Sequence, residues 1–202
     1  VEVFKHYANL LVGIQTSLQQ TVRQIEGGAI DRSSNSAIHQ QLRNQVISLR
    51  NELPSVAQEL GENPMRNPRY LLICDLINGS SRLISAVSGL LRYPSVRPDL
   101  ASLRFIHKAE SALLVAVCER LALWQRLLLK IEEQGNSLPS APADPFQPPE
   151  LWDLFYRNLQ QTNTDDLSFQ QLERMANRIN RCRQIQRTIE ETERQWRHWQ
   201  TS

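Results

Sequence analysis

The sequence has little glycine, few aromatic residues and few cysteines, and each shortage excludes a class of protein. Of 202 residues, 7 are glycine and 6% are aromatic. Sandwiches and barrels use glycine in turns and aromatic or β-branched residues in strands, so an all-β fold is disfavoured. Three cysteines are too few for a disulfide scaffold. With 23 basic and 21 acidic residues, the chain also lacks the strong positive charge of a duplex-binding domain, and we expect no nucleic-acid partner.

Motifs of catalysis and metal binding are missing as well. Cys74, Cys118 and Cys182 lie far apart, no Cys-x-x-Cys occurs, and the four histidines are scattered. Adjacent acids such as Glu132 and Glu133 point about 100° apart on a helix, so they do not converge on one proton or ion. No phosphate-binding loop, nucleophile elbow or zinc-protease motif occurs. We therefore expect no catalytic residues, no cofactor and no metal.

Leader and membrane segments are not visible either. The chain starts at Val1 without a basic and apolar leader, and charged residues interrupt its apolar runs well short of the roughly 20 residues of a membrane span. Three unpaired thiols suit a reducing compartment. We expect a cytoplasmic segment that does not itself cross a bilayer and that belongs to a longer protein.

Helix-forming residues are abundant: 28 leucines, 20 arginines and 19 glutamines. Apolar residues recur at steps of three and four, the pattern of one buried face on a helix. The pattern predicts four long helices, a short helix and a long final helix, over residues 2–26, about 33–60, 67–92, 98–134, 150–161 and 168–199. Pro54 lies inside the second of these and is expected to kink it.

A proline-rich stretch separates the last two predicted helices from the others. Residues 137–149 contain five of the ten prolines, a composition typical of an extended linker. The predicted domains are a four-helix core at 1–136, this linker, and residues 150–202 packing on the core. The predicted fold class is all-α: an elongated antiparallel bundle of long helices with a proline-rich crossover.

A candidate interaction surface lies on the final helix. Arg174, Arg178 and Arg181 are spaced to share one helix face, which could attract anionic headgroups or acidic ligands. Alternatively, this face is solvated and paired with acids such as Glu173 and Glu190.

Two tryptophans extend this candidate surface. Trp196 and Trp199 are flanked by arginines, a combination common at membrane interfaces and protein contacts, although packing at the end of the bundle is the alternative. Asp75, inside an apolar run, is expected to form an ion pair with an arginine such as Arg82 or Arg120, and a ligand contact is the alternative.

Three segments resemble one known family. Residues 4–11 read FKHYANLL, residues 42–50 read LRNQVISLR, and residues 70–91 are leucine-rich on either side of a small-residue centre. They resemble the soluble helices of fusaric-acid-resistance-type (FUSC) aromatic-acid exporters of bacterial inner membranes, over residues 1–135; residues 137–202 are not covered. The resemblance implies a cytoplasmic helical domain, at the inner face of that membrane, that supports assembly or gating. It transfers no site residues.

Two other functions remain open from the residues alone. The first is a soluble helical adaptor that binds another helical protein, or a second copy of the chain, through its last helix. The second is a small-molecule sensor with a pocket between helices. For the exporter domain, the partner is the rest of its own chain.

Overall fold

The computed structural model describes residues 2–27, 31–61, 63–92, 104–130, 138–148 and 169–201, together with 153, 156, 157 and 160. Over these ranges the chain forms five long α-helices and one short 3-10 turn at Pro64–Arg66, and no strand. The helices are α1 (Glu2–Gly27), α2 (Arg32–Glu59), α3 (Pro68–Arg92), α4 (Arg104–Leu129) and α7 (Phe169–Thr201). The predicted all-α bundle is confirmed.

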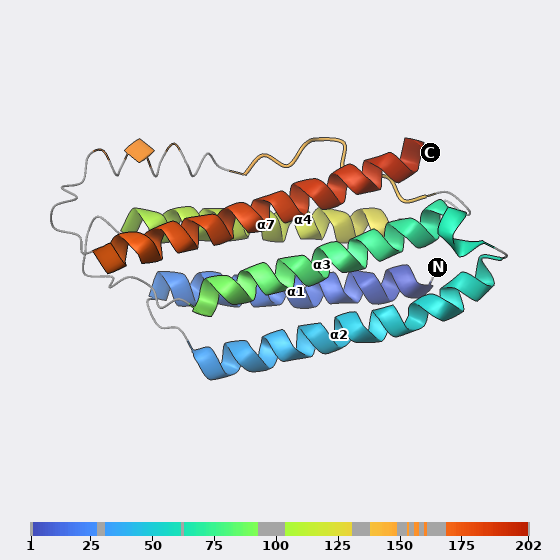
Figure 1. The fold of residues 1–202 in the computed structure, drawn as a ribbon, viewed down its shortest axis with the longest axis horizontal. Helices are drawn as coiled ribbons and strands as arrows, with labels where there is room; N and C mark the ends of the chain where they lie inside the picture. Colours follow the sequence, from blue (N-terminus) through green and yellow to red (C-terminus); the bar gives the residue numbers. More distant parts are fainter. Residues whose placement is uncertain are drawn as a thin grey trace.

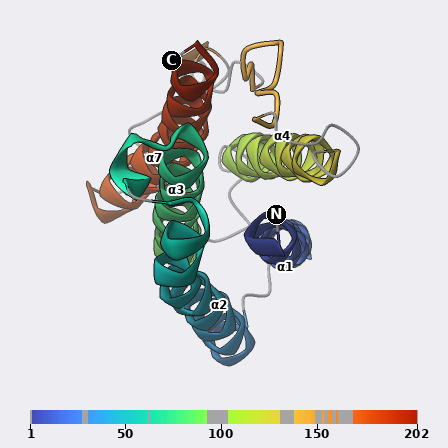
Figure 2. The same cartoon turned by 90° about the vertical axis from the view of Figure 1, so that its right-hand side faces the viewer.

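The helices form two layers that pack face to face. Figure 2 shows α2, α3 and α7 stacked in one layer and α1 and α4 in the other. The most extensive contacts join α1 to α4 and α3 to α7, followed by α2 to α3 and α1 to α2. Each of these four pairs is antiparallel in Figure 1, whereas α4 and α7 run parallel. The four most extensive pairs are thus antiparallel, whereas α4 and α7, which the predicted proline-rich crossover separates in the chain, form a parallel pair.

Helix boundaries follow local chemistry. Asp31 caps the start of α2: its Oδ1 accepts hydrogen bonds from the backbone N–H groups of Ser33 and Ser34, each at 3.1 Å. The helix thus starts one residue before the predicted start at about residue 33. Pro54 lies within α2 as expected. The predicted start of the fourth helix before residue 104 and its end after residue 130 lie outside the described residues, as does most of the predicted short helix at 150–161.

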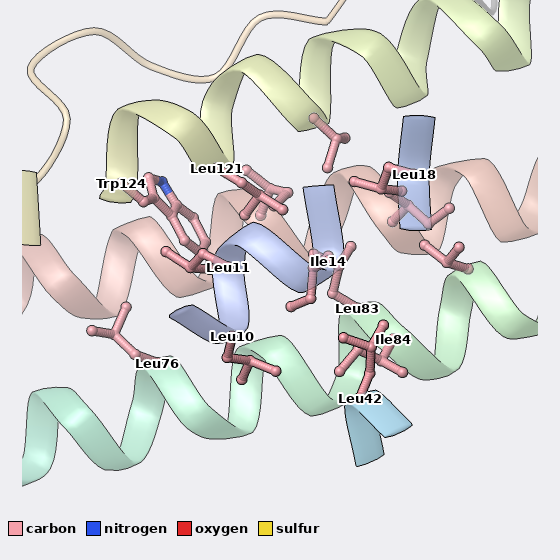
Figure 3. Close-up of a cluster of buried hydrophobic side chains, with 14 of the residues drawn as sticks. Leu10, Leu11, Ile14, Leu18, Leu42, Leu76, Leu83, Ile84, Leu121 and Trp124 are labelled. Atoms are coloured by element: carbon pink, nitrogen blue, oxygen red, sulfur yellow. The ribbon is translucent and has the colours of Figure 1, made fainter. Parts of the chain in front are cut away.

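One continuous apolar core joins all five helices. In Figure 3, Leu11 of α1 lies beside Trp124 and Leu121 of α4, and Ile14 and Leu18 lie further along the same core. Ile185 and Ile189 of α7 belong to the same cluster. Because α7 contributes fully buried side chains to this core, it is an integral member of the bundle.

The most apolar helix is α3. Among the described helices, it is the one that is long and apolar enough to cross a membrane, which the expectation from shorter apolar runs did not anticipate. More than half of this apolar stretch is buried against the other helices. A central helix that is apolar on several sides has this composition in a bundle as well.

The small residues in the middle of α3 allow α7 to approach closely. Gly79 is buried, and a Cβ built on it would collide with Oγ1 of Thr192 and lie 2.9 Å from its Cγ2. Gly27, at the exposed end of α1, has no atom within 4 Å of the same construction. The absence of a side chain at residue 79 therefore allows the close contact between α3 and α7.

We expect Gly79→Ala to destabilise the bundle by about 1–3 kcal/mol, because the added methyl group forces α3 and α7 apart. Thr192→Ala removes both of the atoms that collide, so the double variant should recover part of the loss. Gly27→Ala is the matched control and should be neutral or slightly stabilising. Urea denaturation measures the free energy of unfolding of the wild type, Gly79→Ala, the double variant and Gly27→Ala. Equal effects of the two glycine substitutions would contradict the close contact.

Candidate functional site

The predicted arginine surface is divided by the fold. Arg174 is exposed, but Arg178 is only 1% exposed and lies between α4 and α7. Arg181 is half-buried, with its guanidinium group over Gly89 of α3. The three side chains therefore do not form one basic surface. Arg178 lies inside the bundle because the arc of α7 that it shares with Cys182 and Ile185 is buried.

The two tryptophans also face the bundle. Trp196 is fully buried, its ring packs edge-on against Trp124 at 6.0 Å, and its Nε1 donates to the carbonyl of Pro139 at 2.8 Å. Trp199 is half-buried, and its Nε1 donates to Oδ2 of Asp75 at 2.7 Å. Asp75 therefore bonds to a tryptophan, and the ion pair expected from the sequence is wrong. End-of-bundle packing, the alternative left open for these tryptophans, describes their positions.

A buried ion pair joins the N-terminal halves of α4 and α7. Arg178 donates from Nε to Oε1 of Glu110 at 2.5 Å and from Nη2 to Oε2 at 2.7 Å, a bidentate arrangement. His107, one turn earlier on α4, places Nδ1 3.5 Å from Oε2 of Glu110. Arg178 also donates to the carbonyl of Leu90, so the pair connects α4, α7 and α3. We call Glu110, Arg178, His107 and Cys182 the Glu110 cluster.

Electrostatics within the Glu110 cluster favour ionised Glu110 and a protonated thiol. Burial works to raise the pKa of Glu110, but hydrogen bonds and charges from His107 and Arg178 outweigh burial and lower it. Burial raises the pKa of the Cys182 thiol, and the charge of Glu110 raises it further. A thiol held in its protonated form is a poor nucleophile, so Cys182 acts as a small apolar side chain.

We expect the Glu110 cluster to make stability fall on acidification. A carboxyl whose pKa is lowered by folding stabilises the protein above its unfolded pKa, about 4.5 here, and this contribution is lost as pH falls through the folded value. Urea midpoints of the wild type should therefore drop more steeply below about pH 4.5 than those of Glu110→Met/Arg178→Met. Parallel pH profiles for the two proteins would show that Glu110 does not contribute.

A second buried ion pair joins the C-terminal halves of the same helices. Glu193 of α7 is fully buried and accepts from Arg120 at 2.5 and 2.8 Å and from Nε1 of Trp124 at 2.8 Å. Nη1 of Arg197, one turn further on, lies 3.8 Å from Oε2 of Glu193, which also accepts from Nη2 of Arg120. We call these four residues the Glu193 cluster. Two charged bridges thus link the parallel helices α4 and α7, whose direct contact is much less extensive than that of α1 with α4 or of α3 with α7.

The Glu193 cluster also fixes residues 138–148, which we call the strap. Arg120 donates from Nη2 to the carbonyl of Asp144 and lies 5.9 Å from the ring centre of Phe146. Arg197 reaches the carbonyl of Pro142 at 3.4 Å, and Gln200 reaches that of Pro139 at 3.1 Å. Both prolines are buried. The strap is irregular in backbone, as the proline content predicted, but it packs on α4 and α7 through polar contacts that the sequence did not anticipate.

A shallow groove opens on the outer side of α2 and α3. It encloses about 190 Å³ and is lined by two arginines, two serines and three apolar residues: Arg43, Val46, Ile47, Arg50, Ser81, Ile84 and Ser85. Elsewhere in the described chain, no group of three or more His, Cys, Asp or Glu side chains is arranged to hold a metal ion.

The buried acids were missed by the sequence reasoning, although their spacing carried a signal. Glu110 follows Ile106 by four residues and precedes Leu113 and Leu114, so it falls on the buried face of its helix. Glu193 likewise follows Ile189 by four residues. An acid in phase with an apolar stripe predicts a buried partner of opposite charge.

Comparisons with known proteins give no relative. No protein-family model, no curated protein and no solved structure matches this chain. The assignment of a function therefore rests on the residues and their geometry.

Proposed function

We propose that this chain is a non-catalytic helical domain that supports the assembly or gating of a larger protein, and that the larger protein is a bacterial inner-membrane exporter of the FUSC type. The observation that supports a non-catalytic role is that the buried charged residues of the bundle pair with each other. The buried acids Glu110 and Glu193 bind arginines of the facing helix. These charges pair with each other across α4 and α7 inside the bundle and are not exposed to a substrate.

The exporter half of the proposal is supported by the sequence resemblance. Its three segments fall in α1, α2 and α3, which are consecutive helices of the bundle. In the exporters that the segments resemble, soluble helices follow a membrane-spanning block. The proposed location is accordingly the cytoplasmic face of the inner membrane, and the proposed partner is the remainder of the same protein.

The coding sequence on either side of this chain tests the exporter half. The proposal expects blocks of membrane-spanning helices before Val1 or after Ser202, and it expects the full-length protein in the membrane fraction after lysis. A reading frame without spans, with the protein in the soluble fraction, would overturn the exporter half. The supporting role is then tested on the isolated domain.

A second candidate function is a soluble adaptor, which exposed apolar residues at the start of α7 favour. Phe169 is 81% exposed and Leu172 is 36% exposed. Sedimentation of the isolated domain separates the candidates: an adaptor that self-associates becomes monomeric with Phe169→Ser/Leu172→Ser. A monomer with and without these substitutions would argue against self-association through this site.

A further inference from the structure

We propose that the groove between α2 and α3 binds a phosphate monoester. The feature that points to a ligand is two arginines on one wall of a cavity whose lining contains no acidic residue. Arg43 forms no hydrogen bond or ion pair with another residue in the part of the chain that the structure describes. Arg50 has one neutral partner, donating from Nη2 to Oδ1 of Asn78 at 3.2 Å. Most of the donors on both guanidinium groups remain available.

The spacing of the arginines directs them to one point. Arg43 and Arg50 are seven residues apart on α2, which places them on the same face with about 10 Å between their Cα atoms along the axis. A flexible side chain from each end can reach a ligand seated midway, above Val46 and Ile47. Each guanidinium offers five N–H donors in a planar fork that matches two oxygens of a phosphate or a carboxylate.

The opposite wall adds hydroxyl groups at matching spacing. Ser81 and Ser85 lie one turn apart on α3, so both side chains face the groove. Neither hydroxyl is used in a hydrogen bond with another described residue. A groove with two cations and two hydroxyls fits a phosphate monoester, which carries about −1.5 to −2 charges near neutral pH and three terminal oxygens. A carboxylate offers one charge and two oxygens, and leaves half of this set unused.

The floor of the groove accommodates an apolar body. Val46 and Ile84 are buried, and Ile47 is 52% exposed at the rim. The groove is open to solvent on one side and has a volume of about 190 Å³, which leaves room for a small apolar group beside the phosphate. The ligand class is therefore a phosphate monoester on a small apolar group. Soluble metabolites carry phosphate monoesters, and the lipid phosphatidic acid presents one on diacylglycerol at a membrane surface.

Titration calorimetry with phenyl phosphate tests binding from solution, and flotation with phosphatidic acid vesicles tests binding to the lipid, with phosphatidylcholine vesicles as the blank. We expect the wild type to bind at least one of the two probes and Arg43→Gln/Arg50→Gln to lose at least ten-fold in affinity. Ser81→Ala/Ser85→Ala should lose several-fold. Binding should weaken as salt is raised, because the contacts are exposed and ionic.

The matched control removes two charges outside the groove. Arg23 and Arg187 are exposed arginines of α1 and α7 that do not line it, so Arg23→Gln/Arg187→Gln should bind as the wild type does. Arg43→Lys/Arg50→Lys keeps the charge but loses the planar fork, and should bind with intermediate affinity. Thermal unfolding of each variant verifies that the bundle is intact.

The outcomes separate the sources and test the proposal. Phenyl phosphate binding that is lost in Arg43→Gln/Arg50→Gln assigns a soluble phosphate monoester. Binding to phosphatidic acid vesicles alone, lost in the same variant, assigns the lipid. Absence of binding to both probes overturns the proposal, as does equal loss in the groove variant and in the matched control. The proposal does not depend on the exporter, since the isolated bundle contains every residue of the groove.

Discussion

Replacing Arg178 with methionine is expected to lower the free energy of unfolding by about 3–5 kcal/mol, the cost of leaving a buried charge without its partner. Arg178 is 1% exposed and supplies both of the short hydrogen bonds to Glu110. In the variant, the Glu110 carboxylate stays buried and, of its two charged partners among the described residues, keeps His107, so it must stay ionised at a high cost or take up a proton. Urea denaturation at neutral pH measures the loss.

The double variant Glu110→Met/Arg178→Met distinguishes a buried charge from simple loss of packing. Replacing a whole buried ion pair with apolar residues is often neutral or stabilising, so the double variant should be more stable than Arg178→Met. Arg174→Met is the matched control on the exposed side of α7, and should change stability by less than about 0.5 kcal/mol. Additive losses in the double variant would contradict a direct interaction between the two residues.

Replacing Trp196 with alanine is expected to cost about 3–5 kcal/mol, because it removes a fully buried indole and leaves a cavity between α7, α4 and the strap. Trp196→Phe keeps much of the volume but loses the hydrogen bond to Pro139. Since Gln200 also donates to that carbonyl, we expect the phenylalanine variant to lose only about 1 kcal/mol beyond its smaller packing area.

Trp199→Ala is the control for the effect of losing a tryptophan from this end of the bundle. Trp199 is half-buried, with a single hydrogen bond to Asp75, so its loss should be clearly smaller than that of Trp196. Thermal and urea unfolding of the three variants rank these losses. An equal cost for the two alanine substitutions would contradict the placement of Trp196 against Trp124 beneath the strap.

Most of the fold could be predicted from the sequence because long helices repeat one simple signal. The stripe from Val3 to Ile25 predicted α1 within one residue of its observed end, and the glycine at 27 marks that end. The limits of α3 were also predicted to within one residue. The relative directions of the helices were harder to predict, because no local pattern specifies that α4 and α7 lie side by side and parallel.

The functional residues were harder to predict because burial decides their role. Arg174, Arg178 and Arg181 follow one another at the helical steps of four and three residues. Nevertheless, Arg174 is exposed, Arg178 is buried and Arg181 is half-buried. A helical repeat locates a side chain on its own helix but not relative to a neighbour whose position depends on the whole bundle. The groove shows the same limit, since Arg50 and Ser81 are 31 residues apart in the chain and meet only after α2 and α3 pack.

Hydrogen exchange along α7 tests most directly whether its charged residues hold the bundle together. If the Glu110 and Glu193 clusters lock α7 into the core, amides of residues 178–196 exchange as slowly as those of residues 72–90 in α3, because both open only on global unfolding. Substitution of Arg178 should then speed exchange in both helices together. Protection of α7 a hundred-fold or more below that of α3 would contradict this role and make α7 a peripheral helix.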